Sequence, residues 1–284
     1  MKVIKIEPQG FCNGVKFALN KLYDALNDQN TPRPIYLLGP IIHNSYVNDK
    51  LKDLGVIILD NQTRFDMLNQ IDSGSVVFSA HGVSDKVYQK ALDKKLNIID
   101  TTCPNVKTIQ NNIKEKLNTH KVLYIGKPNH PECEAILELS EKITLITDKT
   151  DLDNLILETE NIYITNQTTL SKYDLIKLYD YAKDKYPSIV IDDKICNATT
   201  LRQDAILNQE DVDLCLIVGD PKSSNSNRLK ELSLNVRKIK TYLISDYKMI
   251  EDEWLQNVNT ISVSAGASTP DYLINAVIEY LKNK

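Results

Sequence analysis

Residues 10–19, which read GFCNGVKFAL, decide the fold because they join an apolar strand (KVIKI) to an amphipathic helix through a cysteine, Cys12. The same arrangement recurs at Cys103 in DTTCPNVKTIQ and at Cys196 in DKICNATTLRQ. The three cysteines are separated by 91 and 93 residues, close to one third of the 284-residue chain. The sequence therefore contains three copies of one plan.

The composition of the chain is that of an ordinary globular protein, with 42% hydrophobic residues, 25% charged residues and a net charge of −4. The mild acidity argues against a general nucleic-acid binder. The sequence shows neither a secretory signal at its N-terminus nor a run approaching the roughly 20 apolar residues of a membrane span. We therefore expect a cytoplasmic protein with reduced thiols. Its five cysteines, an odd number spread far apart, are expected to be ligands, nucleophiles or core residues.

Short β-branched runs predict the strands of each copy. The first copy has PIYLLG, VIIL, VVFSA and LNIID; the second has KVLYIG, ITLIT, IYIT and SIVID; the third has LCLIVG, KTYLIS and TISVSA. The third copy is thus one strand short, whereas the chain opens with a spare one, KVIKI. We predict that this N-terminal strand completes the third domain. Thr199 and Thr200 are the expected N-caps of the helix after Cys196.

Alternating strands and helices predict an α/β fold: three similar small α/β domains with parallel sheets, arranged in a pseudo-threefold ring around a central cavity. No linker rich in glycine, serine or proline separates the copies, so they should pack tightly. The predicted domains are 13–101 for the first repeat, 102–193 for the second and 194–284 for the third, completed by 1–12.

Two polar loops in each copy follow strands directly and repeat at similar distances from the cysteine. The first set is GPIIHNS, GKPNHPE and GDPKSSNSN, with His43, His130 and Ser224 in matching places; the second is SAHGVS, TNQTTLS and SAGASTP, with His81, Thr168 and Ser268. Ligand sites of parallel sheets lie beyond the carboxyl ends of the strands. Threefold packing would therefore bring three cysteines and six loops to one cavity.

Three cysteines converging from three domains suit a soft metal. A structural zinc site usually shows a local Cys-x(2–4)-Cys pair, which the sequence lacks. In a four-iron cluster, Cys12, Cys103 and Cys196 would leave one iron without a protein thiolate, which is a Lewis-acid site for a substrate. Each of these cysteines lies at a predicted helix N-terminus, where the dipole favours a thiolate. Cys215, inside LCLIV, is expected in the core, and the role of Cys133 is left open.

The polar loops contain a set of hydrogen-bond donors without an obvious general-base dyad. Such a set suits a phosphate or diphosphate bound by imidazole, hydroxyl, amide and helix N-terminal donors. The sequence lacks both G-x-G-x-x-G after a strand and G-x-x-x-x-G-K-[ST], so nucleotide sites of those types have no support. The candidate donors are His43, His81, His130, Ser223, Ser224, Asn225 and Ser268.

Glu132 lies two residues after His130 in NHPEC, at a turn that leads into a helix. One loop could therefore supply both an anion donor and a carboxyl group. The residues alone leave two interpretations of Glu132 open: a general acid, or an acidic residue that only favours the helix N-terminus.

Together, these motifs resemble the 4-hydroxy-3-methylbut-2-enyl diphosphate reductase (IspH/LytB) family. The resemblance runs through essentially the whole chain, in the motifs GFCNGV, HN-x-x-V-N, FSAHGVS, D-x-TCP, HPE, QTTLS, IC-x-ATT-x-RQ, SSNSNRL and AGAS-x-PD. The chain departs from what we expect of some relatives at Asn197, after the third cysteine, and at Asp220–Pro221, before the serine run. Neither departure touches a matched ligand.

The resemblance implies a [4Fe–4S] cluster on Cys12, Cys103 and Cys196, whose unique iron binds the substrate hydroxyl. It implies Glu132 as the proton donor, assisted by Thr168. The reaction would take two electrons from ferredoxin or flavodoxin and two protons, expel water, and yield isopentenyl and dimethylallyl diphosphate, as the last step of the non-mevalonate isoprenoid pathway. Neither a nucleic acid nor a membrane is an expected partner. The implied substrate-binding residues are His43, His81, His130, Thr168, Ser223, Ser224, Asn225 and Ser268.

Two other classes stay open at this point. One is a hydro-lyase-type or condensing cluster enzyme, because quinolinate synthases also combine three domains with three cysteine ligands; a substrate poor in phosphate would favour it. The other is a protein that senses iron or oxygen through a cluster. An intact cluster without turnover of any diphosphate would favour that class.

Overall fold

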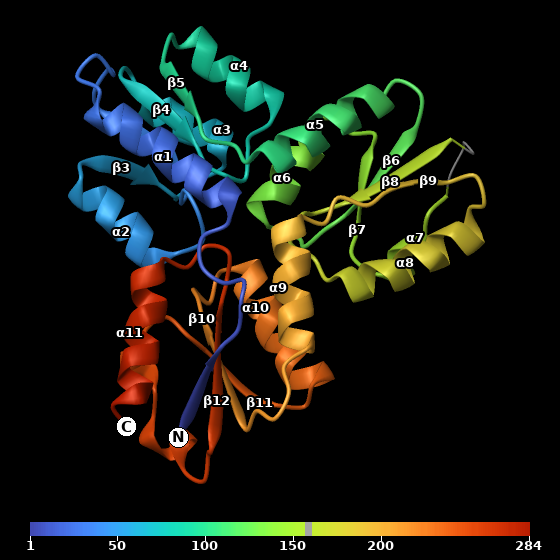
Figure 1. Cartoon of the computed structure of the whole chain (residues 1–284). Coiled ribbons are helices and arrows are strands. Elements are labelled where there is room, and N and C mark those ends of the chain that lie inside the picture. The colour runs from blue at the N-terminus through green and yellow to red at the C-terminus, as the bar shows by residue number, and fades with distance from the viewer. Residues whose placement is uncertain (157–160) are drawn as a thin grey trace. The chain divides into compact units, whose positions relative to one another are not determined.

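The structure is a computed structural model that describes residues 1–156 and 161–284. Strands and helices alternate along the chain, and the strands form three separate four-stranded sheets (Figure 1). Every strand pair for which the register is known is parallel. The central strands are largely buried on both faces, because helices cover both sides of a parallel sheet. In SVVF of the first sheet, for example, all four residues are buried.

The first sheet has the spatial order β3 (Val56–Leu59), β2 (Ile35–Leu38), β4 (Ser75–Phe78) and β5 (Asn97–Asp100). A buried cluster that includes Leu38, Phe78 and Val87 covers one of its faces. The helices of this part of the chain are α1 (Asn13–Asn27), α2 (Ser45–Asp53), α3 (Arg64–Met67), the 3₁₀ turn η1 (Leu68–Gln70) and α4 (Asp85–Asp93).

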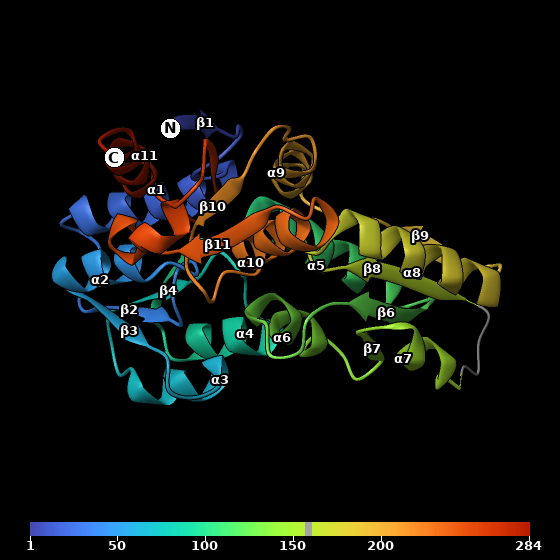
Figure 2. The ribbon, with the colours of Figure 1, turned by 90° about the horizontal axis from the view of Figure 1, so that it is seen from below.

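The second sheet has the spatial order β7 (Ile143–Ile146), β6 (Lys121–Ile125), β8 (Ile162–Asn166) and β9 (Val190–Asp192). Its helices are α5 (Pro104–Lys116), α6 (Pro131–Leu137), α7 (Lys149–Asp153) and α8 (Lys172–Lys185). Residues of α7 and α8 pack with Leu123 and Ile125 on one face, whereas residues of α5 and α6 pack with Val122 and Tyr124 on the other. In both ribbon views α8 runs along this sheet (Figures 1 and 2).

The third sheet has the spatial order β1 (Lys2–Lys5), β12 (Thr260–Ala265), β10 (Leu214–Val218) and β11 (Lys240–Ile244). The N-terminal strand thus pairs with the last strand of the chain, with Lys2 opposite Thr260. The helical elements are α9 (Asn197–Leu207), α10 (Ser224–Glu231), the π-helical turn η2 (Leu232–Val236), the 3₁₀ turns η3 (Tyr247–Met249) and η4 (Asp252–Leu255), and α11 (Asp271–Lys282).

All three sheets share one strand order. In each, the strand that precedes a repeat-related cysteine occupies one edge: β1 before Cys12, β5 before Cys103 and β9 before Cys196. The three parallel α/β sheets confirm the predicted fold class. α9, however, begins at Asn197 with Cys196 at its N-cap position, so the expectation that Thr199 and Thr200 cap this helix is wrong. The amides of both threonines already bond to the carbonyl of Cys196.

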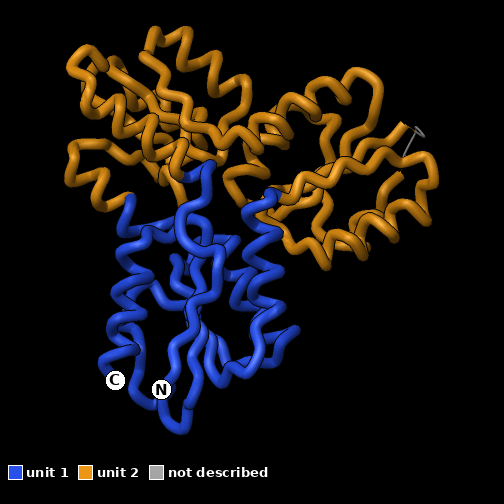
Figure 3. Tube along the Cα trace, viewed as in Figure 1, with its two compact units in different colours: residues 1–15, 43–47, 196–284 blue, residues 16–42, 48–195 orange. Residues whose placement is uncertain are grey.

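The chain divides into two compact units (Figure 3). Unit 1, residues 1–15, 43–47 and 196–284, holds the third sheet; unit 2, residues 16–42 and 48–195, holds the first and second sheets. The pseudo-threefold ring around a central cavity and the domain boundaries 13–101, 102–193 and 194–284, with 1–12 added to the third, stay predictions.

Candidate active site

The three repeat-related cysteines occupy equivalent local settings. Cys103 and Cys196 are the N-cap residues of α5 and α9, and Cys12 stands directly before α1. All three are partly buried thiols. The backbone N–H of Val15 points at the sulfur of Cys12, at 3.4 Å. Helix N-terminal amides and the helix dipole favour a thiolate at these positions, which is the form that binds metals.

In unit 1, a buried arginine of α9 acts on two of these cysteines. Arg202 is 4% exposed and donates to the carbonyl oxygens of Gly10, at 2.6 Å, and Ala198, at 2.8 Å. Burial lowers the pKa of its guanidinium, and electrostatic interaction with Cys12 and Cys196 acts in the opposite direction. A buried cation of unit 1 thus lies close enough to two of the cysteines to interact with them.

In unit 2, Cys103 lies in a hydrogen-bonded turn that is shared with the loop of His81. The N–H of Cys103 donates to Ala80 O at 3.0 Å. Within the turn, Asp100 accepts the N–H and Oγ1–H of Thr102, at 3.0 and 2.5 Å, and the ammonium of Lys107. Burial favours the neutral carboxyl of Asp100, but these hydrogen bonds outweigh it and lower its pKa.

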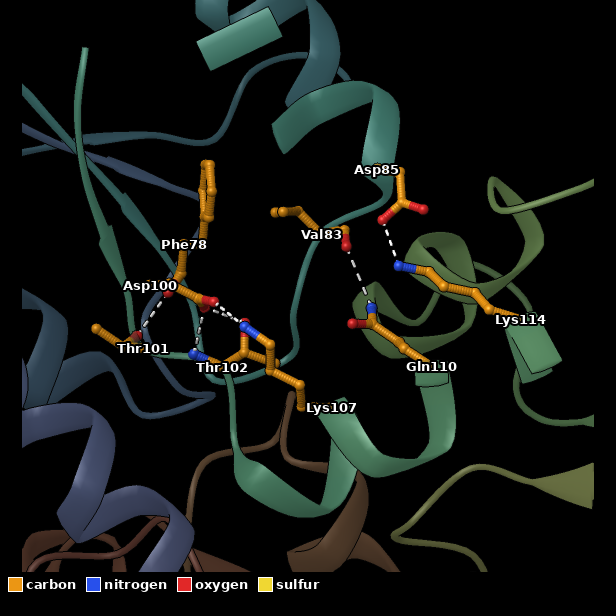
Figure 4. A network of polar contacts seen from close by, with 9 residues as sticks. All are labelled: Phe78, Val83, Asp85, Asp100, Thr101, Thr102, Lys107, Gln110 and Lys114. Carbon is orange, nitrogen blue, oxygen red and sulfur yellow. Dashed lines mark hydrogen bonds and ion pairs between the residues drawn. The ribbon is translucent and has the colours of Figure 1, made fainter. Parts of the chain in front are cut away.

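A hydrogen bond from α5 also holds the loop of His81. Gln110 of α5, 7% exposed, donates to Val83 O at 3.1 Å (Figure 4). Gly82 has a φ of +77°, and a Cβ there would lie 3.0 Å from Nε2 of Gln110 and 3.1 Å from Cγ2 of Thr102. A side chain at this position would therefore be both strained and crowded. The loop of His81 and the segment of Cys103 form one packed element of unit 2.

His81 and His130 come together in unit 2. Their ring centroids are 5.6 Å apart and the rings meet edge to face. His130 is the N-cap residue of α6, and its Nδ1 accepts the N–H of Glu132 at 3.2 Å. Because a backbone amide can only donate, a neutral His130 carries its proton on Nε2. That nitrogen is therefore a donor suited to an anion.

Glu132 and Thr168 form a buried acid–hydroxyl pair in unit 2. Glu132 is 2% exposed, and Thr168, in the loop after β8, is 6% exposed. The Oγ1–H of Thr168 donates to Oε2 of Glu132 at 2.8 Å, and the N–H of Thr168 donates to Oε1 at 2.9 Å. Burial raises the pKa of Glu132, and these hydrogen bonds offset part of the rise. The pair can hold a proton away from water and pass it through the hydroxyl.

In unit 1, a group of hydroxyls lies at the N-terminus of α10. Ser223 is its N-cap residue, and Ser268 Oγ donates to His43 O at 3.1 Å and lies 3.4 Å from Ser223 Oγ. Oγ of Ser224 and Nδ2 of Asn225 are buried without a hydrogen-bond partner among the described residues. Buried donors are rarely left unpaired, so two of them at a helix N-terminus indicate an anion site.

Two glycines allow α10 to approach its sheet. Gly219 follows β10 and Gly266 follows β12; a Cβ at either would lie 2.2 or 2.0 Å from Oγ of Ser226. Ser226 is fully buried and sits in the first turn of α10. Its close contact with both glycines fixes the position of the neighbouring donors, Ser224 and Asn225.

In unit 1, hydrogen bonds also connect the segment of His43 and the turn of Cys12 to the loops around the N-terminus of α10. Asp220 accepts the N–H of Ser45 at 2.8 Å and the N–H of Lys222 at 2.9 Å. Burial raises the pKa of Asp220, but these hydrogen bonds and the charge of His43 lower it overall. The N–H of Ala267 donates to Oδ1 of Asn225 at 3.0 Å, and Ala267 O accepts the N–H of Cys12 at 3.1 Å.

The predicted site residues thus fall into two sets, one in each unit. Convergence of the two sets on one cavity stays a prediction. Arg202, Asp220 and Tyr124, whose hydroxyl contacts Glu132, were not among the predicted site residues. Unit 1 holds Cys12, Cys196, His43, Ser223, Ser224, Asn225 and Ser268; unit 2 holds Cys103, His81, His130, Glu132 and Thr168.

The fold and these two sets define an α/β protein of three parallel sheets that carries thiols at helix N-termini, a group of hydroxyl and amide donors, and a buried carboxyl group. The chain belongs to the LytB protein family, whose model matches residues 3–282. The family resemblance seen in the sequence is therefore confirmed. In the described part of the chain, no helix combines the length and the apolar character needed to cross a membrane.

Relatives of known name match the chain over its full length. It is 43% identical over 286 residues to the 4-hydroxy-3-methylbut-2-enyl diphosphate reductase of Bacillus pumilus, covering 100% of this chain and 91% of the relative. It is 44% identical over 285 residues to the protein of the same name from Bacillus cytotoxicus, covering 99% and 90%.

Two solved structures also resemble the protein. The first is the E-1-hydroxy-2-methyl-but-2-enyl-4-diphosphate reductase from Plasmodium falciparum, with a TM-score of 0.91, 30% identity, and coverage of 99% of this chain and 88% of that one. The second is an (E)-4-hydroxy-3-methyl-but-2-enyl diphosphate reductase, described as the terminal enzyme of the non-mevalonate pathway. Its TM-score is 0.70 at 29% identity, with 100% of both chains covered.

Proposed function

We propose that the protein catalyses the reductive dehydroxylation of (E)-4-hydroxy-3-methylbut-2-enyl diphosphate to isopentenyl and dimethylallyl diphosphate, the last step of the non-mevalonate isoprenoid pathway. The full-length match to relatives of that name carries the proposal. The reaction consumes two electrons and two protons and releases the hydroxyl oxygen as water. Ferredoxin or flavodoxin in the cytoplasm is the proposed electron source.

The proposed cofactor is a [4Fe–4S] cluster held by Cys12, Cys103 and Cys196. Its fit rests on the donor chemistry, because all three thiols stand at helix N-termini and Arg202 offsets negative charge beside two of them. Soft thiolates select iron–sulfur clusters, and three ligands leave one iron open. When bound, the cluster supplies the electrons and a Lewis-acidic iron for the hydroxyl oxygen of the substrate.

The diphosphate is proposed to bind at the N-terminus of α10. Ser224 Oγ and Asn225 Nδ2 are buried and lack acceptors among the described residues, and diphosphate oxygens would provide them. Ser223 and Ser268 add two further hydroxyls to this site, and the backbone carbonyl of His43 accepts the hydrogen bond of Ser268. His81 and His130 of unit 2 are proposed as further donors, the latter through Nε2–H.

Glu132 is the proposed acid. Hydroxide is a poor leaving group, so the departing oxygen needs a proton. Burial raises the pKa of Glu132, which favours the protonated form that such an acid requires. The hydrogen bond from Thr168 Oγ1 to Oε2 provides the route of transfer, in which Thr168 takes the proton from Glu132 and gives its own to the substrate oxygen.

The test uses protein purified without oxygen, assayed with a chemical reductant and the allylic diphosphate. The expected result is both isomeric products, about four irons per chain, and a Mössbauer spectrum in which one iron site changes when the substrate is added. An intact cluster without turnover of the diphosphate would favour the sensor, and turnover of a substrate lacking phosphate would favour the hydro-lyase class. Zinc in protein handled anaerobically would contradict the cluster.

A further inference from the structure

Tyr124 of β6 contacts the carboxyl group of Glu132 from inside the core. Its side chain is fully buried, and its hydroxyl donates to Oε1 of Glu132 at 3.2 Å. The same oxygen accepts the N–H of Thr168, whereas Oε2 accepts the Oγ1–H of Thr168. The two carboxyl oxygens therefore have different surroundings: Oε1 faces two donors and Oε2 faces a hydroxyl, which can donate or accept.

Tight packing holds the Tyr124 ring in place. A Cβ on Gly126 would lie 2.3 Å from Sγ of Cys133 and 3.1 Å from Cε1 of Tyr124, so the glycine gives both side chains room beside the backbone. Cys133, 1% exposed, donates from Sγ to Oε1 of Gln167 at 3.3 Å. The phenol hydroxyl is thus presented to Glu132 by a rigid part of the core rather than by a mobile side chain.

We infer that Tyr124 is a positioning residue: with the amide of Thr168, its hydroxyl fixes Oε1 of Glu132 as the acceptor and leaves Oε2 to carry the proton. The inference deepens the proposed function and rests on it. When Glu132 is protonated, Oε2–H donates to Thr168 Oγ1. In the transfer the Oε2–H bond breaks as a new Oγ1–H bond forms, the former threonine proton goes to the substrate oxygen, which leaves as water, and Glu132 remains as the carboxylate.

Tyr124 itself is not the source of the proton. Burial, with the negative charge of Glu132, raises the pKa of the phenol well above its ordinary value, so the phenol stays a neutral donor. The other titratable groups around the pair are Cys133 and His130 beside Glu132, and Tyr179 of α8, which acts on Tyr124. Burial raises the pKa of both Cys133 and Tyr179, so these two also stay neutral near pH 7.

The test compares Tyr124→Phe with Tyr163→Phe in the cluster-containing protein. Tyr163 of β8 is 2% exposed and belongs to the same buried cluster, but its hydroxyl donates to Asp192. Tyr124→Phe removes a donor that favours the carboxylate, so the pKa of Glu132 should rise by about one pH unit. With a chemical reductant, kcat should fall about tenfold while KM changes less than about twofold. The alkaline limb of the kcat profile should move to higher pH, since the acid acts in its protonated form.

An infrared readout keeps this inference separate from the proposed function. The carboxyl band of Glu132, identified by its loss in Glu132→Gln, should titrate at higher pH in Tyr124→Phe and at the unchanged pH in Tyr163→Phe. An unchanged midpoint in Tyr124→Phe, or an equal shift in both variants, would overturn the role of Tyr124, even in an active enzyme. A wild-type protein without reductase activity would instead refute the proposed function, and with it the catalytic meaning of the contact.

Discussion

The guanidinium of Arg202 donates to the carbonyl oxygen of Gly10 at 2.6 Å, so a buried cation of α9 is anchored on the turn that precedes Cys12. Gly10 has a φ of +75°, and a Cβ there would lie 2.4 Å from Oδ1 of Asp271. Only glycine fits this turn without strain. The hydrogen bond therefore holds a positive charge beside the turn that carries Cys12, a proposed cluster ligand.

Arg202→Gln should lower the reduction potential of the proposed cluster, because an added electron would no longer be stabilised by a nearby positive charge. The expected shift is on the order of 50 mV, equivalent to about 1 kcal/mol for one electron. Potentiometric titration followed by electron paramagnetic resonance measures it. Arg202→Lys, which keeps the charge but not the planar fork, is the control and should retain most of the potential. Equal potentials in the wild type and Arg202→Gln would contradict a role for this charge.

Substitution of the three repeat-related cysteines should distinguish cluster ligands from core residues. Cys12→Ser, Cys103→Ser and Cys196→Ser should each lose or degrade the cluster, since a hydroxyl is a poor substitute for a thiolate at iron. Cys133→Ala and Cys215→Ala are the matched controls, because their side chains are 1% and 0% exposed and pack in the core. Both should keep the iron and lose about 1 kcal/mol of stability. Iron content and thermal unfolding measure the two effects.

The strands and their grouping into three parallel sheets could be predicted from the local apolar pattern and from the comparison of the three copies. Runs such as LCLIV are apolar at every position, as strands buried on both faces must be, and the missing strand of the third copy matched the spare KVIKI at the N-terminus. The expected core position of Cys215 is also confirmed, at 0% exposure. Periodicity did not place the start of α9, because Cys196 and the threonines after it can all stand near a helix start.

The residues that contact and position the predicted site residues could not themselves be predicted, because their roles depend on contacts between distant parts of the chain. Tyr124 in KVLYI looks like an ordinary core residue of a strand, and only the fold places its hydroxyl on Glu132. Arg202 looks like a solvent-facing residue of a helix, yet it is buried. Asp220 stood out only as a departure from relatives, and its bond to the amide of Ser45 spans 175 residues.

Ser224→Ala should weaken binding of the diphosphate without destabilising the protein. Its Oγ is buried and unpaired among the described residues, so removal costs no internal hydrogen bond but costs about 1–3 kcal/mol of binding to a charged ligand. Ser264→Ala is a matched control, since Ser264 Oγ on β12 is equally buried and unpaired. It should leave affinity unchanged. Calorimetry with the substrate, beside thermal unfolding, separates the two effects; equal affinities in both variants would place the diphosphate elsewhere.

Glu132→Gln should bind substrate but turn over at least about a hundredfold more slowly, since positioned proton transfer contributes about 10²–10⁴ in rate. Its amide keeps the shape of the protonated acid and cannot supply its proton. Turnover is measured with a chemical reductant so that electron supply is not limiting. Near-normal turnover would overturn the assignment of the acid.

The free energy of unfolding of Glu132→Gln should also depend on pH differently from that of the wild-type protein. Burial raises the pKa of Glu132 above its ordinary 4.5, so the stability that the neutral side chain contributes is complete below that value and is lost as pH rises through the raised pKa. Wild-type protein should therefore lose free energy of unfolding relative to Glu132→Gln as pH rises. Urea unfolding at several pH values measures the difference, which would stay constant if Glu132 were ionised throughout.

Gly266→Ala should displace the N-terminus of α10 and weaken both stability and diphosphate binding. The new Cβ would lie 2.0 Å from Oγ of Ser226 and 3.2 Å from its Cβ, so the clash is chiefly with the hydroxyl. Overpacking of this kind costs about 1–3 kcal/mol.

Adding Ser226→Ala removes the hydroxyl and should restore part of the stability, although it also removes the contact of Ser226 Oγ with Ser223 Oγ, at 3.1 Å. The free energies of unfolding of the two single variants and the double variant then form a cycle, in which the double variant should lose less than the sum of the single losses. Additive losses would mean that Gly266 does not act through Ser226, and unchanged substrate affinity in Gly266→Ala would mean that this packing does not position the anion site.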